Sequence, residues 1–168
     1  QARHHATPAE DCAACIGWLE QASAYYRGDF LAGFALRSSL PFEEWQTMEQ
    51  ETLHIQALGA LTRIVTFYER RGRPDLVCSY ARRLLALEPW HEQAQFQLMT
   101  ALAACGQETA ALEQFAAYRR LLQEEFGMAP ATALQELAER IRQRALVAAD
   151  MAQDSVHNDM AAASDAIC

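Results

Sequence analysis

Lysine is absent from the sequence, and glycine, proline and the β-branched aliphatic residues are scarce. Val and Ile together number nine, against 19 Leu and 33 Ala in 168 residues. This balance favours helices and provides little material for a β-sheet. Seven Gly and five Pro also leave little material for long loops. The composition therefore predicts an all-α protein, with the length of one domain or of one domain and a tail.

A surplus of positive charge and long apolar runs are also missing. The net charge is −8, and all 14 basic residues are arginine. Contacts to phosphate dominate nucleic-acid affinity, so we expect no direct nucleic-acid binding by this chain. No run approaches 18 apolar residues, and no basic segment leads into a shorter apolar one, so we expect neither membrane contact nor a signal peptide. Five scattered cysteines without such a signal indicate a cytoplasmic protein with mostly buried free thiols.

The sequence motifs of common enzymes are absent. None of GxGxxG, GxxxxGK[ST], HExxH and GxSxG occurs in the chain. His54 lies in the middle of a predicted helix and His91 follows Pro89-Trp90 at a predicted turn, and neither has a nucleophile nearby in the sequence. We therefore expect no enzyme activity, no catalytic residue and no cofactor.

Two helices are predicted in the first 72 residues. The first begins at Thr7-Pro8-Ala9-Glu10, a capping pattern, and runs to about Arg27, before Gly28-Asp29. The second begins at Pro41 and meets no breaker before Gly72, which gives a rod of about 45 Å. Apolar residues recur along both at helical spacing. The expected apolar face of the first helix holds Cys12, Cys15, Ile16, Leu19, Ala22 and Tyr26, and that of the second Phe42, Trp45, Met48, Ile55, Leu58, Leu61, Val65 and Tyr68.

A repeat of 34 residues follows. Gly72 and Gly106 lie 34 residues apart, and each is expected to join two helices. This period is the signature of tetratricopeptide repeats, whose hairpins bury their apolar faces by stacking. We predict a right-handed stack of antiparallel hairpins with six or seven helices, repeats at 58–91 and 92–125, and a closing helix at about 132–146. The whole domain would span 7–146, and 147–168 would form a weakly helical or flexible tail. The aligned positions are Leu61 with Gln95, Ile64 with Leu98, Val65 with Met99, Tyr68 with Leu102, Val77 with Ala111, Ala81 with Phe115 and Leu84 with Tyr118.

Three separated segments carry a resemblance to a known family. They are YRGDFLAGF at 26–34, FEEW at 42–45, and a block at 81–130 that contains EPWHEQAQFQLM and LEQFAAYRRLLQEEFGMAP. Together they resemble the bacterial transcriptional activator domain of the Streptomyces antibiotic regulatory proteins and their relatives, over about residues 16–144. The resemblance implies an all-helical, tetratricopeptide-like domain. In longer family members it follows a winged-helix DNA-binding domain and serves oligomerisation, interdomain contact and engagement of the transcription machinery.

The chain departs from this family in two respects. It contains no winged-helix segment, so promoter reading is not carried over from the resemblance. The last helix of the family begins with a Pro-Ser-Pro-like sequence, whereas this chain has Pro130-Ala131-Thr132, which weakens the helix cap.

The first helix of each repeat has a face that remains after its core positions are assigned. By resemblance to tetratricopeptide repeats this face would be concave. Two arginines seven residues apart, opposite amides and a phenylalanine, could hold an acidic peptide with one apolar anchor. The alternatives are an ordinary solvated groove and a groove filled by the N-terminal helix of the chain. The face holds Thr62, Arg63, Thr66 and Arg70 in the first repeat and Gln93, Phe96, Gln97 and Thr100 in the second.

Cysteine and arginine clusters offer two further candidate sites. Cys12-x-x-Cys15, with His4 and His5 upstream, has the spacing of zinc ligands, but buried core cysteines and redox chemistry remain open alternatives. Arginine can recognise anions bidentately, or can simply solvate helix surfaces and helix C-terminal ends. The arginine clusters are Arg70-Arg71-Arg73, Arg82-Arg83, Arg119-Arg120 and Arg140-Arg142-Arg144.

These observations favour a cytoplasmic, non-enzymatic module of a bacterial transcriptional regulator. Its expected partners are proteins: RNA polymerase subunits, an adjacent winged-helix domain or a second copy of the chain. One alternative is a general tetratricopeptide adaptor that binds an acidic peptide. Another is a zinc-binding or redox-sensing helical module built on Cys12 and Cys15.

Overall fold

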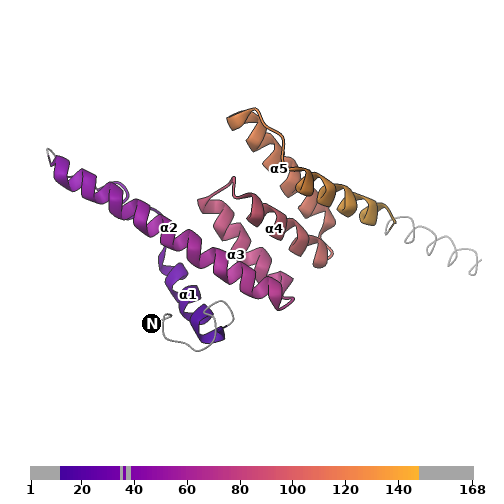
Figure 1. The fold of residues 1–168 in the computed structure, drawn as a ribbon, viewed down its shortest axis with the longest axis horizontal. Coiled ribbons are helices and arrows are strands. Elements are labelled where there is room, and N and C mark those ends of the chain that lie inside the picture. The colour runs from indigo at the N-terminus through magenta and orange to yellow at the C-terminus, as the bar shows by residue number, and fades with distance from the viewer. Residues whose placement is uncertain (1–11, 35, 37–38, 148–168) are drawn as a thin grey trace, which may run out of the picture.

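The computed structural model describes residues 12–34, 36 and 39–147. Within them the chain forms six helices and no strand, and consecutive helices lie side by side along the chain (Figure 1). The predicted all-α, tetratricopeptide-like stack is confirmed. The helices are α1 (Ala13–Tyr25), α2 (Leu40–Arg70), α3 (Pro74–Leu87), α4 (Glu92–Ala104), α5 (Glu108–Phe126) and a last helix over 132–147.

The same turn closes both hairpins. Gly72 has φ +61° and Gly106 has φ +71°, a left-handed conformation that glycine adopts without steric cost. After the first glycine, the N–H of Arg73 donates to the carbonyl of Tyr68 at 3.0 Å, and after the second, that of Gln107 donates to Leu102 at 2.9 Å. These bonds satisfy carbonyls that the ends of α2 and α4 would otherwise leave free. The 34-residue offset in the sequence is therefore an offset in hydrogen bonding as well.

One core lies between the C-terminal part of α2 and the helices that follow. Its small residues allow close helix approach, because Ala81, Ala94 and Ala111 are completely buried. All aligned apolar positions of the repeat are buried or, in the case of Tyr68, packed against this core. Gln95, the polar member of the aligned set, is buried and its amide donates to the carbonyl of Pro89 at 2.8 Å. The largest completely buried side chains of this core are Val65, Leu84, Leu98, Met99, Leu102 and Leu134.

The long helix α2 has two unequal halves. Its 31 residues confirm the predicted rod, with Pro41 in the first turn and Arg70 in the last. The second half packs against α3, whereas the first half projects beyond the stack (Figure 1). The predicted apolar face is wrong there, because Trp45, Met48 and Ile55 are 47%, 71% and 58% exposed. Spacing identified the face correctly, but no helix of the described residues covers it.

Helix α1 packs against α2 through a second, smaller core. Ile16 of α1 is buried there with Ile64 and Phe67 of α2. The helix ends at Tyr25, two residues before the predicted end, and the expected cap at Thr7 lies outside the described residues. On the predicted apolar face Cys15 is buried as expected, whereas Ala22 is exposed and the prediction for it is wrong.

The last helix closes the stack. Leu134, Leu137 and Ile141 are buried against the main core, as their spacing predicts. Leu146 is 61% exposed, so its predicted place on the packed face is wrong. The final turn of this helix extends past the residues against which the earlier turns pack. The predicted tail lies outside the described residues, apart from Val147, and the boundary at residue 7 also stays a prediction.

Candidate functional site

The structure disperses the residues predicted to form a concave binding surface. Arg63 faces α1 and lines a groove with it. Arg70, Gln93 and Thr100 are exposed, whereas Phe96 packs against the main core. Phe96 is therefore partly used in folding and does not stand free as an anchor for a peptide.

Several polar groups of that predicted surface are already paired within the chain. The hydroxyls of Thr62 and Thr66 donate to carbonyls one turn earlier in α2, at 2.9 and 3.0 Å. Gln97 is buried, and its amide donates to the carboxylate of Glu69 at 2.6 Å. This bond joins α2 to α4 and contributes to the stack itself.

A cluster of aromatic rings lies where α2 projects from the stack. Phe30 and Trp45 meet edge to face at 6.0 Å between ring centroids, and Phe42 contacts both Trp45, at 5.6 Å, and Phe34, at 5.8 Å. Phe34 and Trp45 remain about half exposed. We call this cluster, with the neighbouring exposed Leu40 and Met48, the aromatic arm. Its rings come from the two short segments, 26–34 and 42–45, that the sequence resemblance singled out.

Two glutamines one turn apart hold segment 26–34 along α2. The amide of Gln50 donates to the carbonyl of Phe30 at 2.7 Å, and that of Gln46 donates to the carbonyls of Leu31 and Phe34 at 3.1 and 3.3 Å. These bonds satisfy backbone groups in a segment without regular structure. They also fix the aromatic rings of the segment against the helix, so the arm is pre-ordered.

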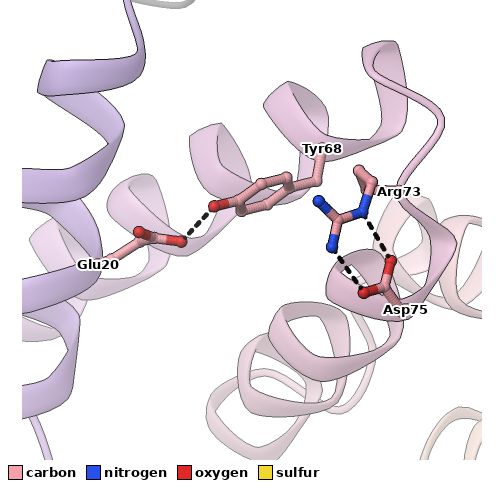
Figure 2. Close-up of polar contacts among 4 residues, drawn as sticks. All are labelled: Glu20, Tyr68, Arg73 and Asp75. Atoms are coloured by element: carbon pink, nitrogen blue, oxygen red, sulfur yellow. Dashed lines mark hydrogen bonds and ion pairs between the residues drawn. The ribbon is translucent and has the colours of Figure 1, made fainter.

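A polar clasp attaches α1 to α2 and α3. Oε1 of Glu20 accepts hydrogen bonds from the hydroxyls of Tyr68, at 2.7 Å, and Tyr80, at 2.9 Å; the first bond is drawn in Figure 2. The two tyrosine rings stack, with centroids 5.9 Å apart. Arg83 donates to the carbonyl of Ser23 at 2.7 Å and so secures the C-terminal end of α1.

The clasp shifts the acidity of both tyrosines. Burial, followed by the hydrogen bond to the Glu20 carboxylate, raises the pKa of Tyr80 to about 12. The hydrogen bond to Glu20, followed by burial, raises the pKa of Tyr68 as well. Both phenols are neutral donors at physiological pH, which is the form that a carboxylate can accept from.

A mostly apolar groove of about 740 Å³ separates α1 from the middle of α2. Small residues keep it open, and a side chain added at Gly59 would meet no atom within 4 Å. The polar groups at its margin include Arg63 and Gln56, two turns apart on α2. We call it the α1–α2 groove. It is lined by Leu19, Ala22, Ser23, Tyr25, Tyr26, Gly28, Phe30, Leu53, Gln56, Ala57, Gly59, Ala60 and Arg63.

Cys12 and Cys15 lie in the first turn of α1. Cys12 is half-buried at the N-cap and Cys15 is buried. The backbone N–H of Cys15, followed by its thiol, lowers the pKa of Cys12, whereas burial raises the pKa of Cys15. No group of three or more candidate ligands for a metal occurs within the described residues, and His4 and His5 lie outside them. The zinc hypothesis therefore stays a prediction.

Arginines from several of the predicted clusters are engaged within the chain. Arg73 pairs with Asp75 through two hydrogen bonds, of 3.0 and 3.2 Å (Figure 2). The guanidinium of Arg71 lies 3.6 Å from the centre of the Phe67 ring, and Arg142 pairs with Glu139. These arginines stabilise the fold, which reduces the arginine available for anion recognition.

Both histidines discussed above have structural contacts. Nδ1 of His91 accepts from the backbone N–H of Ala94 at 3.2 Å and caps α4. The ring of His54 lies edge to face with Tyr26, whose hydroxyl is 3.4 Å from Nδ1. Sequence reasoning missed the clasp, the arm and the groove. Only the arm had a signal in the sequence, because its rings fall in the family-like segments.

Comparison with known proteins gives one match. The family model described as "Bacterial transcriptional activator domain" matches residues 1–142. No curated protein and no solved structure matches the chain significantly. Within the described residues, no helix combines the length and the apolar character that a bilayer-spanning segment needs.

Proposed function

The chain belongs to the family of bacterial transcriptional activator domains, and from this premise we propose that it is a non-enzymatic protein–protein interaction module. In this proposal it works in the bacterial cytoplasm as part of a transcriptional regulator. Its partner is an RNA polymerase subunit, an adjacent winged-helix domain or a second copy. The net charge of −8 disfavours direct contact with DNA by this segment.

The aromatic arm is the observation that carries the proposal. Soluble proteins rarely leave a large contiguous apolar patch in water unless it meets a partner. Here Leu40, Trp45 and Met48 are 65%, 47% and 71% exposed within nine residues of one helix. Aromatic residues and methionine are enriched at protein interfaces, and tryptophan is enriched among the residues that dominate binding energy.

The arm is also mechanically continuous with the stack. Helix α2 runs unbroken from Leu40 to Arg70, so the exposed half and the packed half form one rod of about 45 Å. A partner bound at the arm would therefore be held in a fixed orientation relative to the repeats. This rigidity suits a module that positions one protein against another.

The experiment compares two tryptophans of equal exposure. Trp45→Ala removes an arm residue, whereas Trp90→Ala removes a tryptophan that is 48% exposed in the turn between α3 and α4. Retention of each protein is measured on immobilised RNA polymerase subunits, on a winged-helix domain from the same regulator and on the chain itself. We expect Trp45→Ala to lower retention on one of these partners about tenfold or more, and Trp90→Ala to leave it unchanged.

The opposite result would reject the arm as the contact surface. If Trp90→Ala weakened retention and Trp45→Ala did not, the contact would lie at the α3–α4 turn. If the wild type were retained on none of the three partners at modest salt, the proposed function itself would fail. Circular dichroism of both variants shows whether the helices are intact.

The acidic-peptide adaptor is a second candidate on the opposite face. Arg70, Gln93 and Thr100 are its exposed members, and the alternating placement of α2 and α4 supports it. Arg63→Glu and Arg70→Glu test it separately. A peptide on the predicted concave surface would require both arginines, whereas a requirement for Arg63 alone would point to the α1–α2 groove.

A further inference from the structure

The α1–α2 groove has space that the fold does not require. Gly59 lies inside α2, where glycine weakens a helix relative to alanine, and its backbone is not in the left-handed region. An added Cβ would meet no atom within 4 Å, so close packing within the chain does not explain the glycine either. Together with Ala57 and Ala60 it gives the α2 wall a smooth, small-residue surface.

Polar groups stand at both ends of this smooth surface. Gln56 and Arg63 are seven residues apart on α2, which places them on one face about 10 Å from each other. Within the described part of the chain, neither side chain has a hydrogen bond or an ion pair. An unpaired guanidinium next to an apolar surface is a ready partner for a carboxylate.

The charges around the groove set a direction. Burial, followed by the nearby carboxylates of Asp29 and Glu51, raises the pKa of Tyr26. Negative charge therefore surrounds the Tyr26 end, and Arg63 supplies positive charge farther along α2. An anionic head group would be repelled from the first position and attracted to the second.

We propose that the α1–α2 groove binds a small amphiphilic carboxylate. The carboxylate pairs with Arg63, the apolar body lies over Gly59 and Ala60 between Leu19 and Leu53, and the far end reaches Gln56. A groove of about 740 Å³ is within the range of small-molecule sites, roughly 300–1,000 Å³.

The walls of the groove argue for a small ligand over an extended peptide. Both walls are helices, whose interior N–H and C=O groups are already hydrogen-bonded within the helix. They offer no row of backbone partners for a peptide main chain, which is what strand-like peptide recognition uses. The proposal is independent of the aromatic arm and goes beyond the proposed function.

The test uses three probes with the same ten-carbon chain and different head groups. Sodium decanoate, decan-1-ol and decyltrimethylammonium are titrated into the full chain below their micelle concentrations, and binding is followed by calorimetry and by amide chemical shifts. We expect saturable binding of decanoate, about tenfold tighter than that of decyltrimethylammonium. The largest shifts should fall on Leu19, Gly59 and Arg63.

Three variants locate the site. Arg63→Glu should reverse the preference between the two charged probes, and Ala60→Phe, which fills the groove, should abolish saturable binding of both. Arg120→Glu, an exposed arginine of α5, is the matched control and should leave binding unchanged. Unfolding midpoints within a degree or two of the wild type establish that the variants fold.

Several outcomes would overturn the proposal. Equal binding of decanoate by the wild type and by Ala60→Phe would place the probe elsewhere on the molecule. An absence of saturable binding by any probe would also reject it. Arg63-dependent capture of a synthetic helical peptide rich in Leu and Glu, without decanoate binding, would assign the groove to a protein partner. Loss of a dimer in Ala60→Phe, measured by sedimentation, would assign it to a second copy.

Discussion

The hydroxyl of Tyr68, on α2, donates a hydrogen bond of 2.7 Å to Oε1 of Glu20, on α1, across 48 residues of sequence. Tyr80, on α3, donates to the same oxygen at 2.9 Å. One carboxylate oxygen thus joins three helices. Because the second core contains only a few buried side chains, this clasp is a substantial part of what attaches α1 to the stack.

Removing the charge of Glu20 should weaken that attachment. Glu20→Gln keeps the shape of the side chain but replaces two charge-assisted bonds by weaker ones, so we expect the free energy of unfolding to fall by about 1–2 kcal/mol. Tyr68→Phe and Tyr80→Phe should each cost less, about 1 kcal/mol. Urea unfolding of the single and combined variants measures these values.

The combined variants decide whether the three residues act as one unit. Adding Glu20→Gln to the double variant Tyr68→Phe, Tyr80→Phe should cost almost nothing more, because all three changes remove the same bonds. Tyr25→Phe is the control, since Tyr25 is 86% exposed on the same helix. Full additivity of the three changes would contradict a shared clasp.

Alkaline pH should release the clasp. The pKa of Tyr80 is raised to about 12 in the folded protein, and that of Tyr68 is raised as well, against about 10 in an unfolded chain. A raised pKa means that the folded state favours the protonated phenol, so the stabilisation is complete below pH 10. It is lost as the pH rises from about 10 to 12.

This loss can be followed by stability measurements across that pH interval, with tyrosinate absorbance as the titration signal. The double variant Tyr68→Phe, Tyr80→Phe should show a shallower decline of stability over the same range. Two further tyrosines, Tyr26 and Tyr118, also have a raised pKa, so part of the decline should persist in the variant. An identical decline in both proteins would exclude the clasp as the cause.

Two glycines of α2 and its hairpin should respond in opposite directions to alanine. Gly72→Ala places a Cβ at φ +61° and should cost about 1–2 kcal/mol. Gly59→Ala fills open space in a helix and should stabilise the chain by about 0.5–1 kcal/mol. Thermal or urea unfolding measures both, and stabilisation by Gly72→Ala would mean that the left-handed turn is not needed.

The thiols of α1 should differ in reactivity. Cys12 is half-buried and its pKa is lowered, whereas Cys15 and Cys78 are buried and their pKa values are raised. Since the thiolate is the nucleophile, we expect iodoacetamide at neutral pH to modify Cys12 well before Cys15 and Cys78. Peptide mass mapping at successive times gives the order, and prior modification of Cys15 would contradict the geometry of the first turn.

Much of the fold follows from local features of the sequence. Alanine and leucine predicted helices, and Gly72 and Gly106 predicted turns at a fixed offset. The same turn geometry at both glycines is the outcome, because a left-handed residue is needed wherever such a helix ends. Burial of Leu61, Leu84 and Leu98 was likewise predictable, since helical spacing identifies the face that must leave water.

Spacing alone could not say whether a predicted face meets a partner. Trp45 and Met48 have the same periodicity as Leu61 and Val65, yet only the second pair is covered. A pattern reports which side of a helix is apolar, whereas burial also depends on the length of the neighbouring helices. Helix α3 is 14 residues long and cannot cover the 31 residues of α2.

The sequence by itself determined the helices, the hairpin turns and the membership of the family. The tertiary structure decided which long-range polar groups meet, where α1 lies and which hollow remains beside it. The bonds from Tyr68 and Tyr80 to Glu20 link residues 48 and 60 positions apart, and no local pattern in the chain encodes such a meeting. A helix period fixes the direction of side chains around one axis, but the contacts between axes depend on how all the helices pack at once.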